Sequence, residues 1–367
     1  MSFSAIPTSQ ILTSAEKYCF FTPAQLKELS FVMEGIEKDP ARQEQFFRDY
    51  ATFIERKEWD DAWGKNNQED KGGIRLAVTL AAVEEVIARR KEEQTAPLEC
   101  LLESLPEIRV WMEYHEESYG KIGLEFDNGF AWIILRIFPG SVLRFGRLEC
   151  NRSSFFGDVL YFENRITRER KAMLNGIYPF DAKGRITEKE NAAFFSVPAG
   201  ARCFGGYAGN LIRRNGSVEK EVTILENNEW KCILHPGDEV LYLHIPAGGP
   251  LTDVEDSLKR MKSYFFHLPD YHPKAFICSS WLFSPVLQEI LGESSNLLHF
   301  QNIFQQIPAV TTQGGVISRV FGGKAVREGI RSVPWNTTLR KKIGEILERG
   351  ENFPAGRVLL FPDEIEE

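Results

Sequence analysis

The most informative segment of the sequence is a loop with two adjacent glycines in EVLYLHIPAGGPLTDVEDSLKRM, residues 239–261. An apolar run predicts a strand over 239–246, and Thr252, followed by acidic residues, predicts a capped helix over 252–268. Backbone N–H groups converge in such a loop, and the helix dipole favours negative charge there. The N–H groups that could bind a phosphate are those of Ala247, Gly248, Gly249, Leu251 and Thr252. An ordinary turn that needs small residues for packing is the alternative.

Other chemical motifs are not supported by the sequence. The six cysteines are scattered, with no CxxC pair and no histidine at metal-ligand spacing, which argues against a zinc or redox motif. No GxSxG occurs, and FGGK at 321–324 is too short for a P-loop. The basic run at 165–171 and the pair Arg213 and Arg214 could contact a phosphate, but such runs usually form solvated faces.

The predicted secondary structure changes from helices to strands near Gly120. Residues 1–120 predict helices, including a Thr22 cap with Pro23 at the first helical position and an end at Gly120. Strands are then predicted over 141–151, 158–165, 220–226, 229–234 and 239–246. Beyond the helix over 252–268, the pattern predicts a strand over 274–283, a helix over 294–307, and strands over 314–322 and 356–361 around a helix over 337–350.

Composition restricts the partners. The formal net charge of −8, from 52 acidic and 44 basic residues, gives no overall attraction to nucleic acid or to an anionic membrane. No secretory signal pattern and no run of 18 apolar residues is present, so we expect a cytoplasmic protein. The sequence does not indicate the oligomeric state.

Several segments, in order, resemble a known family. They are WMEYHEESYGKIGL (111–124), FGRLECN (145–151), HPGDEVLYLHIPAGGPL (235–251), CSSWLFSP (278–285) and SSNLLHFQNIF (294–304). The sequence is similar to bacterial acyltransferase-domain proteins with a helical N-terminal N-acyltransferase domain and a GNAT-like C-terminal domain.

The resemblance implies an α+β fold: a helical domain over 1–120, then a GNAT-like mixed twisted sheet flanked by helices over 121–367, with a β-hairpin-rich insertion at about 160–225. The strands over 239–246 and 274–283 should be adjacent and parallel, and their splay should admit the pantetheine arm. The reaction implied is acyl transfer from acetyl-CoA or a longer acyl-CoA to a small-molecule or peptide amine, without a metal. The coenzyme A site implied is formed by Ile245, Ala247, Gly248, Gly249, Leu251, Thr252 and Asn296.

Acyl transfer to an amine requires a base and a proton source for the leaving thiolate. His244, which shares a strand face with Tyr242, is the first candidate base, and a structural histidine is the alternative. Glu149 is the second candidate, with a solvated surface carboxylate as the favoured alternative. The hydroxyl of Ser280 could assist the leaving sulfur, or it could be a buried hydrogen-bonding partner.

The helix predicted over 294–307 allows more than one interpretation of its residues. Asn296 resembles the asparagine that holds pantetheine in many GNAT proteins, although a helix cap explains it equally well. Phe300 and Phe304 occupy the helix that usually provides a tyrosine acid, so a catalytically inert acyl-CoA-binding or sensing protein is an alternative function. A cupin-like binding module is disfavoured, because only His235 and His244 lie near one another in that region.

Overall fold

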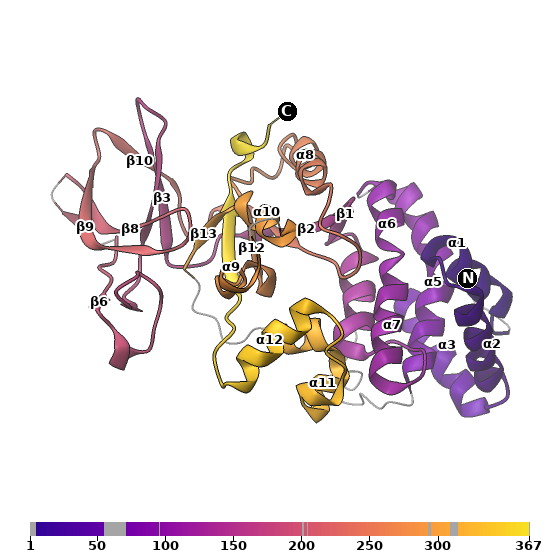
Figure 1. The fold of residues 1–367 in the computed structure, drawn as a ribbon. Helices are drawn as coiled ribbons and strands as arrows, with labels where there is room; N and C mark the ends of the chain where they lie inside the picture. The colour runs from indigo at the N-terminus through magenta and orange to yellow at the C-terminus, as the bar shows by residue number, and fades with distance from the viewer. Residues whose placement is uncertain are drawn as a thin grey trace. The chain divides into compact units, whose positions relative to one another are not determined.

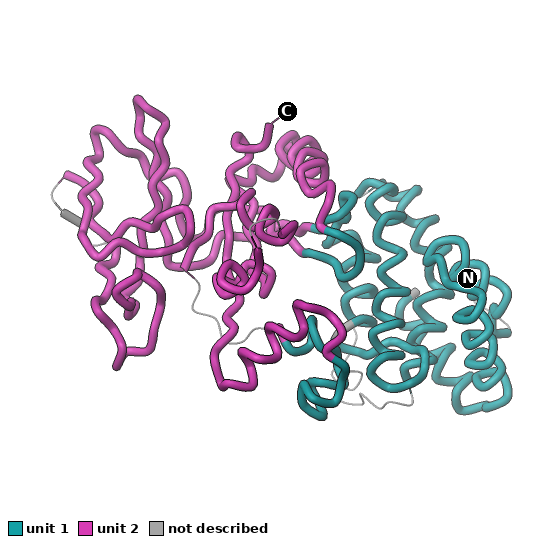
Figure 2. The backbone as a smooth tube through the Cα atoms, in the orientation of Figure 1, with its two compact units in different colours: residues 1–149, 245–250, 317–334 teal, residues 150–244, 251–316, 335–367 magenta. Residues whose placement is uncertain are grey.

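The structure is a computed structural model that describes residues 5–54, 71–94, 96–199, 202–203, 205–292, 295–308 and 315–366. The chain forms two compact units, each built from three segments (Figure 2). Unit 1 comprises Met1–Glu149, Ile245–Pro250 and Ile317–Pro334, and unit 2 comprises Cys150–His244, Leu251–Val316 and Trp335–Glu367. The division into domains at 1–120 and 121–367 stays a prediction.

Unit 1 is mainly helical. Its α-helices are α1 (Thr8–Cys19), α2 (Pro23–Glu37), α3 (Pro40–Ile54), α5 (Gly72–Glu93), α6 (Leu98–Ser104), α7 (Glu107–Tyr119) and α11 (Gly322–Glu328) (Figure 1). The α2 start predicted from the sequence is confirmed, because Thr22 and Gln25 form a reciprocal capping box and Pro23 is the first helical residue. Helix α7 ends at Gly120, which adopts a left-handed conformation with a φ of 69°.

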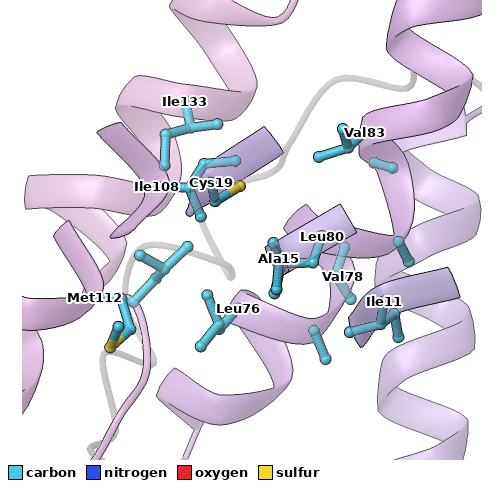
Figure 3. Packing of buried hydrophobic residues seen from close by; sticks show 14 of the residues in the cluster. Ile11, Ala15, Cys19, Leu76, Val78, Leu80, Val83, Ile108, Met112 and Ile133 are labelled. Atoms are coloured by element: carbon cyan, nitrogen blue, oxygen red, sulfur yellow. The ribbon is translucent and has the colours of Figure 1, made fainter. Parts of the chain in front are cut away.

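Helix α5 lies at the centre of the unit 1 core. Small and apolar residues occur on every side of its N-terminal half. This half of the helix is therefore buried against several other helices. Figure 3 shows side chains of α1, α5 and α7, among them Ile11, Leu76, Leu80 and Met112, packed in one cluster. Burial of each such side chain stabilises the fold by about 1.5 to 3 kcal/mol, so this cluster fixes the position of α7.

Unit 2 is built on two sheets. The first has the strand order β1-β2-β11-β12-β14-β13, and the second has the order β10-β3-β4-β8-β7, with β9 paired to β8. The first sheet consists of β1 (Leu143–Phe145), β2 (Leu148–Ser154), β11 (Glu239–His244), β12 (Phe276–Ser280), β14 (Gly356–Leu360) and β13 (Gln305–Ile307). Strand β1 and the first two residues of β2 belong to unit 1.

The second sheet corresponds to the hairpin-rich region expected from the sequence. It consists of β3 (Val159–Asn164), β4 (Arg170–Leu174), β7 (Arg202–Cys203), β8 (Gly206–Ile212), β9 (Val218–Glu226) and β10 (Trp230–Leu234). A short hairpin of β5 (Pro179–Phe180) and β6 (Phe194–Phe195) lies within the same stretch of chain. Apolar residues of both sheets, such as Tyr161, Leu174, Ile277 and Leu359, form one buried cluster, so the second sheet is part of the unit 2 core.

The strands that should carry the site pair as predicted. Strands β11 and β12 are parallel, with Leu241 opposite Phe276 and Tyr242 opposite Ile277. Their ladder ends there, although β11 continues to His244 and β12 to Ser280. Strands β12 and β14 are antiparallel, which makes the sheet mixed.

Helices cover the remaining parts of unit 2. They are α8 (Val254–Phe265), α9 (Val286–Ile290), α10 (Asn296–Asn302) and α12 (Thr338–Glu348). The combination of a helical unit with mixed sheets confirms the α+β class. None of the helices in the described part of the chain is both long and apolar enough to span a membrane.

Three sequence predictions about elements are wrong. Helical turns at Phe126–Phe130 and Ile133–Ile137 continue after Gly120, where only strands were expected. The strand predicted over 314–322 is helical at Ile317–Phe321, because the buried residues Val316 and Val320 are four apart, which is helical spacing. The helix predicted over 294–307 ends at Asn302, and Gln305–Ile307 instead pairs with β14 as β13.

Candidate active site

The glycine loop that follows β11 requires its glycines for conformation. Gly248 has a φ of 84° and Gly249 a φ of 72°, in the left-handed region that residues with a Cβ rarely adopt. A Cβ placed at Gly249 would meet no atom within 4 Å, and one at Gly248 would meet only Val110, at 4.0 Å. The backbone at Gly249 is therefore open to the approach of another molecule.

Arg147 holds this loop in place. Its Nε donates to the Pro250 carbonyl at 2.9 Å, and its Nη1 donates to the Pro246 carbonyl at 2.9 Å. Sequence reasoning did not assign Arg147 a role, although it lies in the FGRLECN segment. The contact joins residues about one hundred positions apart, so only the folded structure could reveal it.

The helix after the loop begins later than predicted. Helix α8 starts at Val254, and its N-cap is Asp253, in a left-handed conformation with a φ of 58° and no side-chain cap hydrogen bond. The prediction that Thr252 caps this helix is therefore wrong. Ile245, Ala247, Gly248 and Gly249 lie in unit 1, whereas Leu251 and Thr252 lie in unit 2. Their contact with coenzyme A stays a prediction.

Glu149, the second predicted candidate for the base, is a buried carboxyl group with a strongly raised pKa. Its side chain is buried, at 1% exposure, so the alternative of a solvated surface carboxylate is wrong. Its carboxyl group lies beside that of Glu107, which is also buried, and the Arg144 guanidinium lies 3.9 Å away. One carboxyl oxygen of each glutamate is buried without a hydrogen-bond partner. Burial, and then the neighbouring Glu107 carboxyl group, raise the pKa of Glu149 well above its usual value.

Glu107 is a member of this site that the sequence did not reveal. It is the first residue of α7, and the Trp111 Nε1, one helical turn later, donates to it at 3.2 Å. Two buried carboxyl groups beside one another disfavour the state in which both are ionised. The neighbouring Glu107 is therefore one cause of the raised pKa of Glu149.

His244 lies in unit 2, at the end of β11, and is half-buried. Its Nε2 is 2.6 Å from the Asn151 Oδ1, and its ring packs against Tyr242, with ring centroids 5.1 Å apart. A neutral imidazole could donate from Nε2 to this amide oxygen. The contact fits both a positioned base and a structural histidine.

Ser280 makes a structural hydrogen bond, whereas Asn296 is exposed. The Ser280 hydroxyl accepts from the Leu282 N–H at 3.2 Å and caps the helical turn Trp281–Phe283. Asn296 is exposed and is the first residue of α10, whose N-cap is Ser295, so the capping explanation for Asn296 is wrong. Phe300 and Phe304 are buried against Phe283. Within the described ranges, no group of three or more His, Cys, Asp or Glu side chains could hold a metal ion.

Comparison with known proteins identifies the family. The GNAT-like C-terminal domain family matches residues 142–359, which is more than half of the chain. The chain therefore belongs to this family, and the resemblance seen in the sequence is confirmed. A comparison with curated proteins gave no match.

Solved acyltransferase structures share the fold over nearly the whole chain. A crystal structure of an acyltransferase in complex with decanoyl-CoA gives a TM-score of 0.55, with 18% identity over 96% of this chain and 87% of that chain. An acyltransferase in complex with decanoyl-CoA and teicoplanin gives a TM-score of 0.53, with 18% identity over 92% and 86% of the two chains. A mutant acyltransferase in complex with octanoyl-CoA gives the same values. This likeness confirms the expected GNAT-like fold.

Proposed function

We propose that this protein is an acyl-CoA-dependent N-acyltransferase that transfers an acyl group from the coenzyme A thioester to an amine of a small molecule or peptide. Family membership supports the reaction class. The similar acyltransferases bind octanoyl-CoA or decanoyl-CoA, and one of them also binds teicoplanin, which favours these longer donors and a peptide-like acceptor. The observation that carries the proposal is the open glycine loop fixed by Arg147 at the end of β11.

The proposed coenzyme A site uses backbone N–H groups rather than charged side chains. The N–H groups of residues 245–252 other than those of the prolines would bind the diphosphate, and the α8 dipole would add favourable charge. The end of the β11–β12 ladder at Tyr242 and Ile277 supports a place for the pantetheine arm between the continuing strand ends. Asn296 would contact that arm.

The proposed base is Glu149. An ammonium group must lose a proton before its nitrogen can attack the thioester carbonyl, and an ionised carboxyl group with a raised pKa is an effective acceptor for that proton. Attack forms the amide bond, breaks the carbon–sulfur bond and leaves a thiolate, which takes up a proton to give free coenzyme A. Glu149 must first lose its own proton, so we expect activity to rise with pH as this group ionises.

His244 is the competing candidate for the base, and Ser280 is the candidate hydroxyl near the leaving sulfur. The hydrogen bond between His244 and Asn151 would fix the imidazole for either catalysis or structure. A bacterial source and a cytoplasmic location accord with the family resemblance and with an intracellular supply of coenzyme A thioesters.

The proposal is tested by combining binding and turnover. Isothermal titration should detect decanoyl-CoA and octanoyl-CoA, with acetyl-CoA as the short-chain comparison, and release of free coenzyme A should depend on an added amine. Binding with no amine-dependent release from any of a broad amine panel would favour the inert acyl-CoA-binding alternative. The absence of binding to all three thioesters would contradict the proposed function.

A His244→Ala variant tests which residue is the base. It should keep the affinity for decanoyl-CoA, and a loss of turnover without unfolding would favour His244 over Glu149 as the base.

A further inference from the structure

One face of the first sheet changes from apolar to polar at the ends of β11 and β12 and the start of β14. In the β12–β14 pair, Ile277 lies opposite Leu359 and Ser279 lies opposite Arg357. Tyr242 lies opposite Ile277 in the parallel pair, and side chains of paired residues point to the same face. Tyr242, Ser279 and Arg357 therefore share the face whose inner part is the buried unit 2 cluster.

Arg357 has no anionic partner within the described ranges of the chain. The half-buried guanidinium lies over the Phe156 ring, 5.4 Å from its centroid, and forms no ion pair there. Its Nε is fully enclosed without an acceptor, whereas its terminal nitrogens are not enclosed and also make no hydrogen bond to a described residue. Asp158, an acidic residue of the adjacent loop, instead accepts from the Tyr178 hydroxyl. The terminal N–H groups of Arg357 are thus available to an acceptor from outside the protein.

The loop that joins β2 to β3 is shaped around this guanidinium. Gly157 has a φ of 134°, and a Cβ at this position would lie 2.5 Å from the Arg357 Nη1. Any other residue would displace the guanidinium or the loop. Phe156 also stacks on Tyr242, with ring centroids 5.9 Å apart and planes 16° from parallel. The Arg357 guanidinium therefore lies between the Gly157 backbone and the Phe156 ring.

A hydroxyl donor accompanies the guanidinium. The Tyr242 ring stacks on the same Phe156 ring that the Arg357 guanidinium lies over. The phenolic O–H of Tyr242 can donate one hydrogen bond to another group. The face therefore offers one positive charge with a planar fork of N–H donors and a nearby phenolic donor.

We propose that Arg357 and Tyr242 bind a carboxylate of the acceptor, so that the acceptor is an amine that also carries a carboxylate. The guanidinium fork matches the two oxygens of a carboxylate, and its single charge balances a monoanion, whereas a phosphate dianion would call for a second cation. The acceptor part of this inference depends on the proposed function, while the carboxylate site itself does not.

The test measures how fast p-hydroxyphenylglyoxal modifies Arg357 in the full-length protein, with peptide mass spectrometry as the readout. Glycylphenylalanine should slow modification of Arg357 by about fivefold or more at saturation, because a bidentate carboxylate shields the guanidinium. Glycylphenylalaninamide, which lacks the carboxylate, should not. Equal modification rates with both peptides would overturn the proposal, as would protection by inorganic phosphate equal to that by glycylphenylalanine.

Variants separate this site from the coenzyme A site. Tyr242→Phe keeps Arg357 for labelling and should weaken the protection by glycylphenylalanine. Tyr178→Phe is the matched control, because it removes a hydroxyl that donates to Asp158, and it should leave the protection unchanged. Arg357→Gln should keep its affinity for decanoyl-CoA in isothermal titration. If that affinity falls about tenfold or more while the protein stays folded, the anion is a coenzyme A phosphate and the acceptor assignment is wrong. Protection by glycylphenylalanine without any acyl-CoA binding would show that the proposed function fails while the carboxylate site stands.

Discussion

Two glutamates on consecutive strands, β2 and β3, have the same side chain but very different surroundings. Glu149 on β2 and Glu163 on β3 are both buried, with 1% and 7% exposure. Glu163 lies 2.8 Å from an Arg168 nitrogen, 2.9 Å from the Lys231 Nζ and 3.3 Å from an Arg170 nitrogen. These hydrogen bonds and charges lower the pKa of Glu163 to about 2.

Glu149 has the opposite surroundings. A second carboxyl group, that of Glu107, contacts it, and the Arg144 guanidinium is 3.9 Å away rather than within hydrogen-bonding distance. Burial raises the pKa of Glu149, while cations lower that of Glu163. A carboxylate neutralised by cations stabilises the fold, whereas one kept close to protonation can exchange a proton during a reaction. The comparison therefore favours Glu149 over Glu163 as the reactive group.

The largest expected effect follows from removal of the carboxyl group that we propose as the base. Glu149→Gln should lower kcat/KM by about 100-fold to 10,000-fold, the usual contribution of a general base, while decanoyl-CoA affinity is retained. Amine-dependent coenzyme A release and isothermal titration check the two parts. A variant with full turnover would remove Glu149 from the mechanism.

The same variant should be more stable than the parent at alkaline pH. The pKa of Glu149 is raised in the folded state, so its contribution to stability is complete below the pKa of the unfolded chain and is lost as pH rises towards the folded pKa. Glutamine cannot ionise and avoids this loss. Thermal unfolding at pH 5 and pH 8 should show a gain for Glu149→Gln mainly at pH 8.

The glycine loop provides the next largest effect. Gly249→Val should weaken decanoyl-CoA binding by about tenfold or more, because valine strains a backbone at a φ of 72° and covers the N–H groups. Gly237→Val is a matched control, since Gly237 has a φ of 94° and similarly open surroundings but lies in the turn before β11. If both variants lose equal affinity in isothermal titration, strain alone explains the loss and the phosphate site is not supported.

Glu107→Gln should have a smaller effect on turnover and a distinct effect on its pH dependence. Without the Glu107 charge, the pKa of Glu149 should fall, so that Glu149 ionises at lower pH. The rise of kcat/KM with pH should therefore move to lower pH. An unchanged pH profile in an active Glu107→Gln protein would show that the carboxyl pair does not control the reaction.

The sequence predicted local elements well and long-range contacts poorly. The β11 and β12 strands, their parallel pairing and the Thr22 cap follow from patterns within a few residues or from one crossover connection. The contact of Glu107 with Glu149 depends instead on a helix and a strand that are more than forty residues apart, and no local pattern indicates it. The Arg147 contacts with the glycine loop also join residues far apart in the sequence, so no local pattern indicates them. The burial of Glu149 could not be predicted for the same reason.

The smallest expected effect on activity comes from the contrasting glutamate. Glu163→Gln should leave kcat/KM unchanged, because the carboxylate is neutralised by three cations and its low pKa prevents proton exchange near neutral pH. It should instead lower stability at pH 7 by about 1.5 to 3 kcal/mol, the usual range for hydrogen bonds to a charged group. Since the pKa is depressed in the folded state, the contribution of Glu163 is present above its unfolded pKa and is lost as pH falls towards about 2. Urea unfolding of both proteins at pH 7 and pH 3 should therefore show a smaller difference at pH 3. A Glu163→Gln protein with lowered turnover and parental stability would reverse the roles that we assign to the two glutamates.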